Sequence, residues 1–209
     1  MCFSAPVSFA ASGGLVLLGG ATYLAASKKD KILVAIPLLF GVQQAFEGVQ
    51  WLYLNKGSTS PVAGYGFLFF ALMVWPVYVP AFVFTLDKKH RKILGWFVLA
   101  GTAVALYFLG LMLTQTLSIR VLSKSVRYSL NFRHQWLVTP AYLLAIFGSL
   151  FVSSRPIFRW FGLAISILAL IAWKLYAMEF VSVWCFFAAI VSSMFFVYVQ
   201  YQRFARARE

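Results

Sequence analysis

The sequence predicts an all-α membrane protein, a bundle of seven transmembrane helices, on three observations. First, 62% of the residues are hydrophobic and 11% are charged, whereas soluble domains are roughly 45 to 50% apolar and about 25% charged. Second, seven apolar runs each approach the roughly 20 residues that a helix needs to cross the hydrocarbon core. Third, most lysines and arginines fall between these runs. Residues 1–209 are therefore predicted to form a single transmembrane domain.

The seven predicted spans follow one another through the chain with short connections. They cover residues 7–27, 32–54, 62–86, 93–117, 136–153, 157–178 and 181–201. Pro76 and Pro80 are predicted to kink or break the third span, because each proline removes a helical hydrogen bond. The glycine pairs at residues 13–14 and 19–20 predict that another helix packs closely on the first span.

The distribution of basic residues predicts the orientation, because short cytoplasmic loops carry an excess of lysine and arginine. Alternate loops carry twelve basic residues on one side and six on the other. The side with twelve includes the C-terminus, so the N-terminus is predicted to be outside and the C-terminus cytoplasmic. Since topology accounts for the formal net charge of +13, we predict the lipid bilayer as a partner and no nucleic acid.

The one long connection, residues 118–135, is basic. It carries Arg120, Lys124, Arg127 and Arg133. Between residues 126 and 132 apolar and polar residues alternate, which indicates a short strand or hairpin. We therefore expect an extended outer lid between the fourth and fifth helices that attracts anions. In the alternative interpretation, these arginines only contact lipid headgroups at the membrane surface.

The second span contains a carboxylate among glutamines. Gln43, Glu47 and Trp51 are spaced at i, i+4 and i+8, and Gln44 precedes Glu47 by three residues, so all four share one helical stripe. An ionisable group inside a membrane is a functional-site candidate, and we expect this stripe to face the bundle interior. In the alternative interpretation, Glu47 only holds helices together through donors on its neighbours.

Further polar groups are predicted to gather at the outer side of the bundle, near Glu47. They are Cys2, His134, Lys174, Glu179 and Cys185. Removal of Met1 would leave Cys2 with an amine and a thiol. Together with an imidazole and a carboxylate, these are ligand types of catalytic zinc sites. We therefore expect a Zn cofactor held by Cys2, Glu47 and His134, with a disulfide between Cys2 and Cys185 as the alternative.

These groups predict metal-assisted hydrolysis or hydration, because zinc lowers the pKa of a bound water. Glu47 would be a ligand or the general base, and Tyr128 would orient the substrate beside it. The residues expected to bind an anionic or lipid-like substrate are Gln43, Gln44, Trp51, Lys174 and Glu179. Two alternatives stay open: a small transporter or channel with Glu47 as its proton or cation site, and a structural or lipid-binding protein. A homo-oligomer is also open.

Three blocks of the sequence carry a resemblance. The chain begins MCFSAPVSF, has IPLLFGVQQAFEG at residues 36–48, and has SVWCFFAA at residues 182–189. In these blocks it resembles a family of uncharacterised bacterial multi-pass membrane proteins that begin with MCFSA. The resemblance implies a bacterial inner membrane, and it places the following residues in recognisable blocks: Cys2, Ser4, Gln44, Glu47, Tyr128, His134, Trp184 and Cys185.

Overall fold

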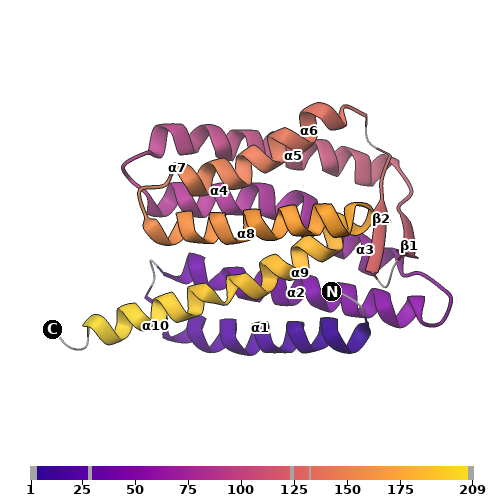
Figure 1. The fold of residues 1–209 in the computed structure, drawn as a ribbon, viewed down its shortest axis with the longest axis horizontal. Helices are drawn as coiled ribbons and strands as arrows, with labels where there is room; N and C mark the ends of the chain where they lie inside the picture. Colours follow the sequence, from indigo (N-terminus) through magenta and orange to yellow (C-terminus); the bar gives the residue numbers. More distant parts are fainter. Residues whose placement is uncertain (1–3, 28–29, 123–124, 132, 207–209) are drawn as a thin grey trace.

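Helices that are long and apolar enough to cross a membrane dominate the fold. The structure is a computed structural model and describes residues 4–27, 30–122, 125–131 and 133–206. Within these residues seven such helices lie roughly side by side (Figure 1). They are Ala5–Leu24, Lys31–Leu54, Pro61–Leu86, Arg91–Thr114, Gln135–Val152, Pro156–Leu175 and Ala177–Tyr201. The predicted spans agree with these helices to within a few residues.

Four spans are continuous α-helices, and three are composite. The continuous ones are α1 (Ala5–Ala25), α2 (Lys31–Leu54), α5 (Arg91–Thr114) and α8 (Pro156–Leu175). The third span joins α3 (Pro61–Leu68), the π-helix η1 (Phe69–Val74) and α4 (Trp75–Leu86). The fifth joins α6 (Gln135–Leu143), the π-helix η2 (Leu144–Gly148) and α7 (Ser149–Val152). The seventh joins the 3-10 turn η3 (Ala177–Glu179), α9 (Phe180–Ser192) and α10 (Met194–Arg206).

The third span passes Pro76 without breaking. Proline cannot donate to the preceding turn, and a π-helical stretch accommodates it, with the Trp75 N–H bonded to the Phe70 carbonyl five residues earlier. The carbonyl of Pro76 then lies against α5 at Gly101, where an added Cβ would be 1.7 Å from the oxygen. Only a residue without a side chain fits at that crossing.

The close approach of α1 and α2 depends mainly on glycines of α2. An added Cβ at Gly41 would meet Val16 at 2.8 Å, and one at Gly48 would meet Phe9 at 2.9 Å. Of the glycines on α1, Gly19 alone has a neighbouring atom within 4 Å of such a Cβ. The prediction that both glycine pairs of the first span form the contact was therefore wrong in part, because the small residues of the partner helix admit the large side chains of α1.

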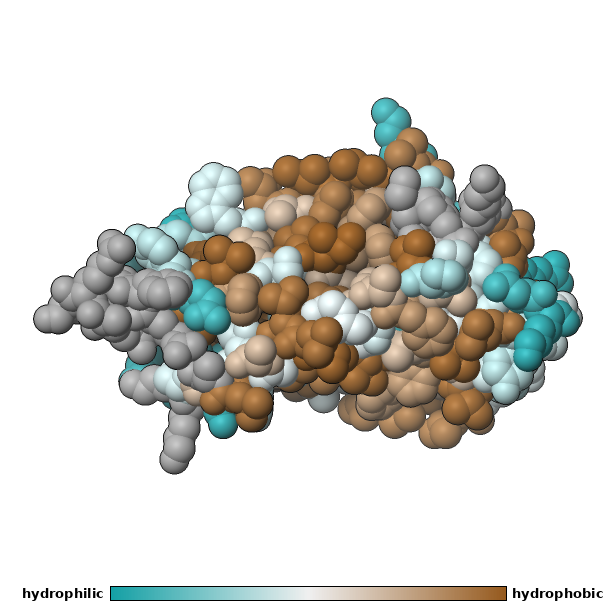
Figure 2. All heavy atoms as spheres, turned by 90° about the horizontal axis from the view of Figure 1, so that it is seen from below, coloured by the Kyte–Doolittle hydropathy of each residue, from teal (hydrophilic) through white to brown (hydrophobic). Residues whose placement is uncertain are grey.

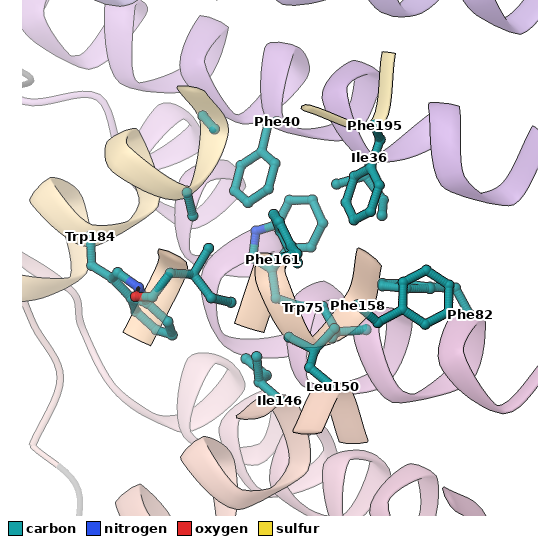
Figure 3. Close-up of a cluster of buried hydrophobic side chains, with 14 of the residues drawn as sticks. Ile36, Phe40, Trp75, Phe82, Ile146, Leu150, Phe158, Phe161, Trp184 and Phe195 are labelled. Carbon is teal, nitrogen blue, oxygen red and sulfur yellow. Dashed lines mark hydrogen bonds between the residues drawn. The ribbon is translucent and has the colours of Figure 1, made fainter. Parts of the chain in front are cut away.

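Aromatic side chains fill the main core, between α2, α4, α8 and α9. Figure 3 shows Phe40 and Trp75 in the middle of this cluster, and their rings stack with centroids 3.8 Å apart. Toward one end, Phe82 packs edge-on against Phe158, with centroids 5.4 Å apart. Packing of this kind associates helices inside a bilayer, where burial from water supplies no driving force.

The surface is that of an integral membrane protein. Figure 2 shows hydrophobic residues across the middle of the molecule and hydrophilic residues toward its two ends. Four tryptophans near helix ends are 63 to 77% exposed, and tryptophan typically marks the membrane–water interfaces. Trp136 and Trp173 lie at one end of the bundle, and Trp96 and Trp160 lie at the other.

An antiparallel hairpin lies at the first of these ends, which we call the hairpin end (Figure 1). Its strands are β1 (Ser118–Leu122) and β2 (Ser125–Ser129). The predicted extended segment in this connection is thus confirmed, although its strands begin and end earlier than the alternation of residues 126–132 suggested. Val126 is fully buried and packs with Ala5 of α1 and Trp51 of α2.

A buried carboxylate joins two loops at the opposite end. Asp87 follows α4, is 1% exposed, and accepts hydrogen bonds from the hydroxyls of Ser153 and Ser154 at 2.8 and 3.0 Å. Burial raises the pKa of Asp87, but the hydrogen bonds from Ser154, Ser153 and the His90 N–H outweigh it and lower the pKa from 3.8 to about 2. The charged form therefore ties the α4–α5 loop to the α7–α8 loop.

Replacement of Gly101 by alanine is expected to lower stability by about 1–3 kcal/mol, because the new methyl group would overlap the Pro76 carbonyl. Thermal unfolding of the detergent-purified protein measures this. Gly110 lies on the same helix with no atom within 4 Å of an added Cβ, so Gly110→Ala should instead stabilise by about 0.5–1 kcal/mol. Equal melting temperatures for the two variants would contradict the proposed crossing.

Asp87 is expected to make the stability of the fold depend on pH in the acidic range. Its folded pKa lies below the unfolded value, so its contribution is complete above about pH 4 and is lost as pH falls toward 2. Asp87→Asn should therefore melt at a lower temperature than the wild type at neutral pH. Melting curves recorded between pH 2 and pH 7 should show this difference shrinking over the acidic interval. A difference that is constant with pH would show that the charge of Asp87 has no role.

Candidate functional site

The polar stripe of α2 lies inside the bundle, as predicted. Gln43, Gln44, Glu47 and Gln50 are all 0% exposed, and Trp51 is 5% exposed. Glutamine and glutamate at these positions cannot reach water or lipid headgroups, so their polar atoms depend on partners from neighbouring helices. The stripe is therefore a polar interior within an otherwise apolar bundle.

Hydrogen bonds fix the stripe to other helices. The Ser182 hydroxyl on α9 donates to Oε1 of Glu47. The indole Nε1 of Trp75, at the start of α4, donates to Oε1 of Gln43 at 2.7 Å. These bonds hold α2, α4 and α9 in one arrangement, since each partner is fully or almost fully buried.

Several polar atoms around Glu47 lack hydrogen-bonding partners among the protein atoms of the described residues. They are both side-chain polar atoms of Gln44 and Gln50, Nε1 of Trp51 and Oγ of Ser8. A buried polar group without a partner costs about 1–3 kcal/mol. The interior beside Glu47 thus has more hydrogen-bonding capacity than its neighbours use, which is typical of sites that bind water or a polar ligand.

A cavity of about 400 Å³ lies beneath the hairpin, between η1, α5, α6 and α9. Its walls are formed by apolar side chains, including Leu68, Ala71, Leu72, Phe108, Phe180 and Trp184. Its polar rim is formed by Arg127, Ser129, Gln135 and Thr139. Because Gln135 and Thr139 are exposed on α6, the rim opens to the outside of the bundle.

One π-helical segment borders this cavity, and the other begins directly after residues of the cavity wall. Ala71 and Leu72 belong to η1, and Tyr142 and Leu143 directly precede η2. The Tyr142 hydroxyl donates to the Ala71 carbonyl at 2.6 Å, so the last turn of α6 is joined to η1 across the cavity wall. A wide π turn displaces the side chains that follow it, and such turns are frequent at functional sites.

Cys185 connects the cavity with the polar stripe. Its side chain lines the cavity, and Gln43 and Glu47 both lie close to its thiol. Glu47 itself does not line this cavity. The side chain of Cys185 therefore lies between the Glu47 carboxylate and the cavity.

The structure brings some of the predicted site residues together. Gln43, Gln44, Glu47 and Trp51 form the stripe, and the buried thiol of Cys185 adjoins it. Cys2, the other half of the alternative disulfide, lies outside the described residues. The ring of Tyr128 stacks on Phe67 at 4.8 Å and also lines the cavity. Trp184 lines the cavity and stacks on Phe180 at 5.3 Å.

Other predicted residues lie elsewhere. His134 is exposed at the start of α6 with a left-handed φ of 59°, and it lines a separate surface hollow beside Tyr107. Lys174 is exposed in the last turn of α8. Glu179 is buried in η3, and the Ser4 side chain does not cap α1.

The predicted zinc site gains no support from the part of the chain that the structure describes. Within it, no three or more histidine, cysteine, aspartate or glutamate residues lie together as a metal site. Cys2, the third predicted ligand, lies outside the described residues. Glu47 is fully buried, whereas His134 is exposed and lines a surface hollow that Glu47 does not line.

Sequence reasoning missed several residues of the site. Ser182 has a local signal, because it precedes Cys185 by one helical turn and so lies on the same face of α9. Trp75 and Tyr142 have none, since their partners are 32 and 71 residues away. The rim residues Gln135 and Thr139 are likewise defined only by the cavity that the helices enclose.

Comparison with known proteins identifies a family but no activity. The whole chain, residues 1–209, matches a family described as "Family of unknown function (DUF6629)". Searches of curated proteins and of solved structures found no match. The predicted membership in an uncharacterised family is thus confirmed, and the match covers the whole chain.

Replacement of Ser182 by alanine should remove the donor to Glu47 and cost about 1–3 kcal/mol, because a buried carboxylate oxygen loses a hydrogen bond. Thermal unfolding in detergent measures this loss. Ser193→Ala is the matched control, since Ser193 is on the same span and its hydroxyl donates to the Ile190 carbonyl of its own helix. If both variants melt alike, the Ser182–Glu47 bond does not stabilise the bundle.

Proposed function

The chain belongs to this family of unknown function, and we propose from its geometry that it binds a lipid-like amphiphile with an anionic head. One observation carries the proposal. The cavity beneath the hairpin is apolar along its walls and carries Arg127 at its polar rim. Its volume of about 400 Å³ is within the range of small-molecule sites, roughly 300–1,000 Å³.

The opening of the cavity suits a ligand that arrives from the bilayer. Gln135 and Thr139 on α6 and Ala177 and Met178 in η3 line the cavity and are exposed. These two elements lie at the hairpin end, close to the exposed Trp136 of the membrane interface. An acyl chain entering between them would remain in apolar surroundings while its head stayed at the level of the lipid headgroups.

In this proposal the hairpin is a lid on the outer side of a bacterial inner membrane, and the C-terminus is cytoplasmic. The excess of basic residues at the opposite end of the bundle supports this orientation. The basic hairpin would then face the outer leaflet.

Binding accounts for the geometry better than hydrolysis or ion transport does. A general base must lie within hydrogen-bond reach of the reacting group, whereas Glu47 is fully buried and does not line the cavity. Ion transport through Glu47 would need an open path to its carboxylate, of the kind that paired interrupted helices provide in transporters. Glu47 is instead fully buried. In the binding proposal, the stripe of α2 instead holds the cavity wall at Cys185 in place.

Filling the cavity should abolish binding. Thr139→Trp would place an indole at the rim, and Leu137→Trp, on the same helix but 56% exposed and outside the cavity lining, is the matched control. Native mass spectrometry of protein purified in a maltoside detergent, titrated with dodecyl phosphate, should show a bound amphiphile for the wild type and Leu137→Trp. The adduct should be lost in Thr139→Trp. Equal adducts in all three proteins would exclude this cavity as the binding site.

A further inference from the structure

Two arginines face each other across the hairpin. In the register of β1 and β2, Arg120 is the direct partner of Arg127. Direct partners project to the same face of a sheet with Cβ atoms about 5 Å apart. Arg127 is half-buried at the cavity rim, and Arg120 is exposed beside it.

Like charges in this position oppose folding of the hairpin, since directly opposed residues of equal charge destabilise a strand pair. In the described residues, no carboxylate forms an ion pair with either arginine. Glu179 is the carboxylate on the element next to β2, and it is buried in η3. The hairpin therefore carries two adjacent positive charges that a bound anion would stabilise.

Hydroxyl groups adjoin the arginines on the same face. Ser118 and Ser129 are direct partners two residues further along the strands, and alternate residues of a strand share a face. Nε of Arg127 donates to the Ser129 hydroxyl at 3.1 Å. This bond fixes the orientation of the guanidinium and leaves its terminal N–H groups for another acceptor.

We propose that Arg120 and Arg127 bind a phosphate group, the head of the amphiphile whose chain occupies the cavity. This inference rests on the proposed function for the position of the chain. A phosphate monoester carries about 1.5 to 2 negative charges and three strong acceptor oxygens, which matches two guanidinium groups. A carboxylate carries one charge and would leave one arginine uncompensated. Arginine forks also match phosphate oxygens bidentately.

The phosphate inference is tested by comparing the affinities of three amphiphiles that share one chain length and differ in the head group. Dodecyl phosphate, dodecanoate and dodecyl glucoside are titrated in turn into the maltoside-solubilised protein, and the affinity is measured by native mass spectrometry. Dodecyl phosphate should bind at least about tenfold more tightly than the other two, because dodecanoate lacks the second negative charge that faces the second arginine and dodecyl glucoside carries no charge. Arg120→Gln and Arg127→Gln should each remove most of this difference.

Arg133→Gln is the matched control, because Arg133 is exposed in the same connection but outside the hairpin strands. It loses the same charge and should bind like the wild type. Equal affinity for all three heads, with binding still blocked in Thr139→Trp, would overturn the phosphate inference and leave the proposed function standing. Binding that depends on both arginines but not on Thr139→Trp would overturn the proposed function and retain the phosphate site.

Inorganic phosphate tests whether the site binds free phosphate or the phosphate head of a lipid. It is added at constant ionic strength, and the melting temperature and dodecyl phosphate binding are recorded. A higher melting temperature in the wild type but not in Arg120→Gln, with displacement of dodecyl phosphate, assigns the site to free phosphate as well. If neither inorganic phosphate nor sulfate displaces dodecyl phosphate, and dodecyl phosphate is still the preferred amphiphile, the site binds the phosphate head of a lipid. Loss of affinity equal in Arg133→Gln and Arg120→Gln would show a general charge effect and overturn the paired site.

Discussion

The rest of the structure depends on the burial of Glu47 within the bundle. A carboxylate in a membrane interior is costly unless donors surround it, and the Ser182 hydroxyl on α9 supplies one. The glycines of α2 bring α1 close on one side, while Val126 of the hairpin packs on Trp51, one helical turn from Glu47. The packing of α1, α9 and the hairpin around α2 thus encloses one ionisable group.

Helix α9 both encloses Glu47 and forms part of the cavity wall. Ser182 and Cys185 lie one turn apart on α9, and the first bonds Glu47 while the second lines the cavity. A shift of α9 that opened the cavity would therefore also disturb the carboxylate. Polar contacts inside a bundle can specify one arrangement of helices, and here that arrangement determines the shape of the cavity.

Sequence reasoning reached the spans, the hairpin and the buried stripe of α2, because apolar length, strand alternation and helical spacing are local patterns. It did not reach the partner of Glu47, since Ser182 is 135 residues away. It also grouped His134 with Glu47 because both were assigned to the outer side of the membrane. Two groups at a similar depth can lie on different helices with other helices between them, and residue spacing carries no information about that separation.

The two faces of β2 connect the interior of the bundle with the membrane surface. Val126 points toward Trp51 and the stripe of α2, while its neighbour Arg127 stands at the cavity rim opposite Arg120. Repulsion between the arginines works against the strand pairing that keeps Val126 buried. An anion between them would strengthen that pairing, and so tighten the packing over Glu47. Through alternation along one short strand, charge at the headgroup level would thereby influence the stability of the polar interior.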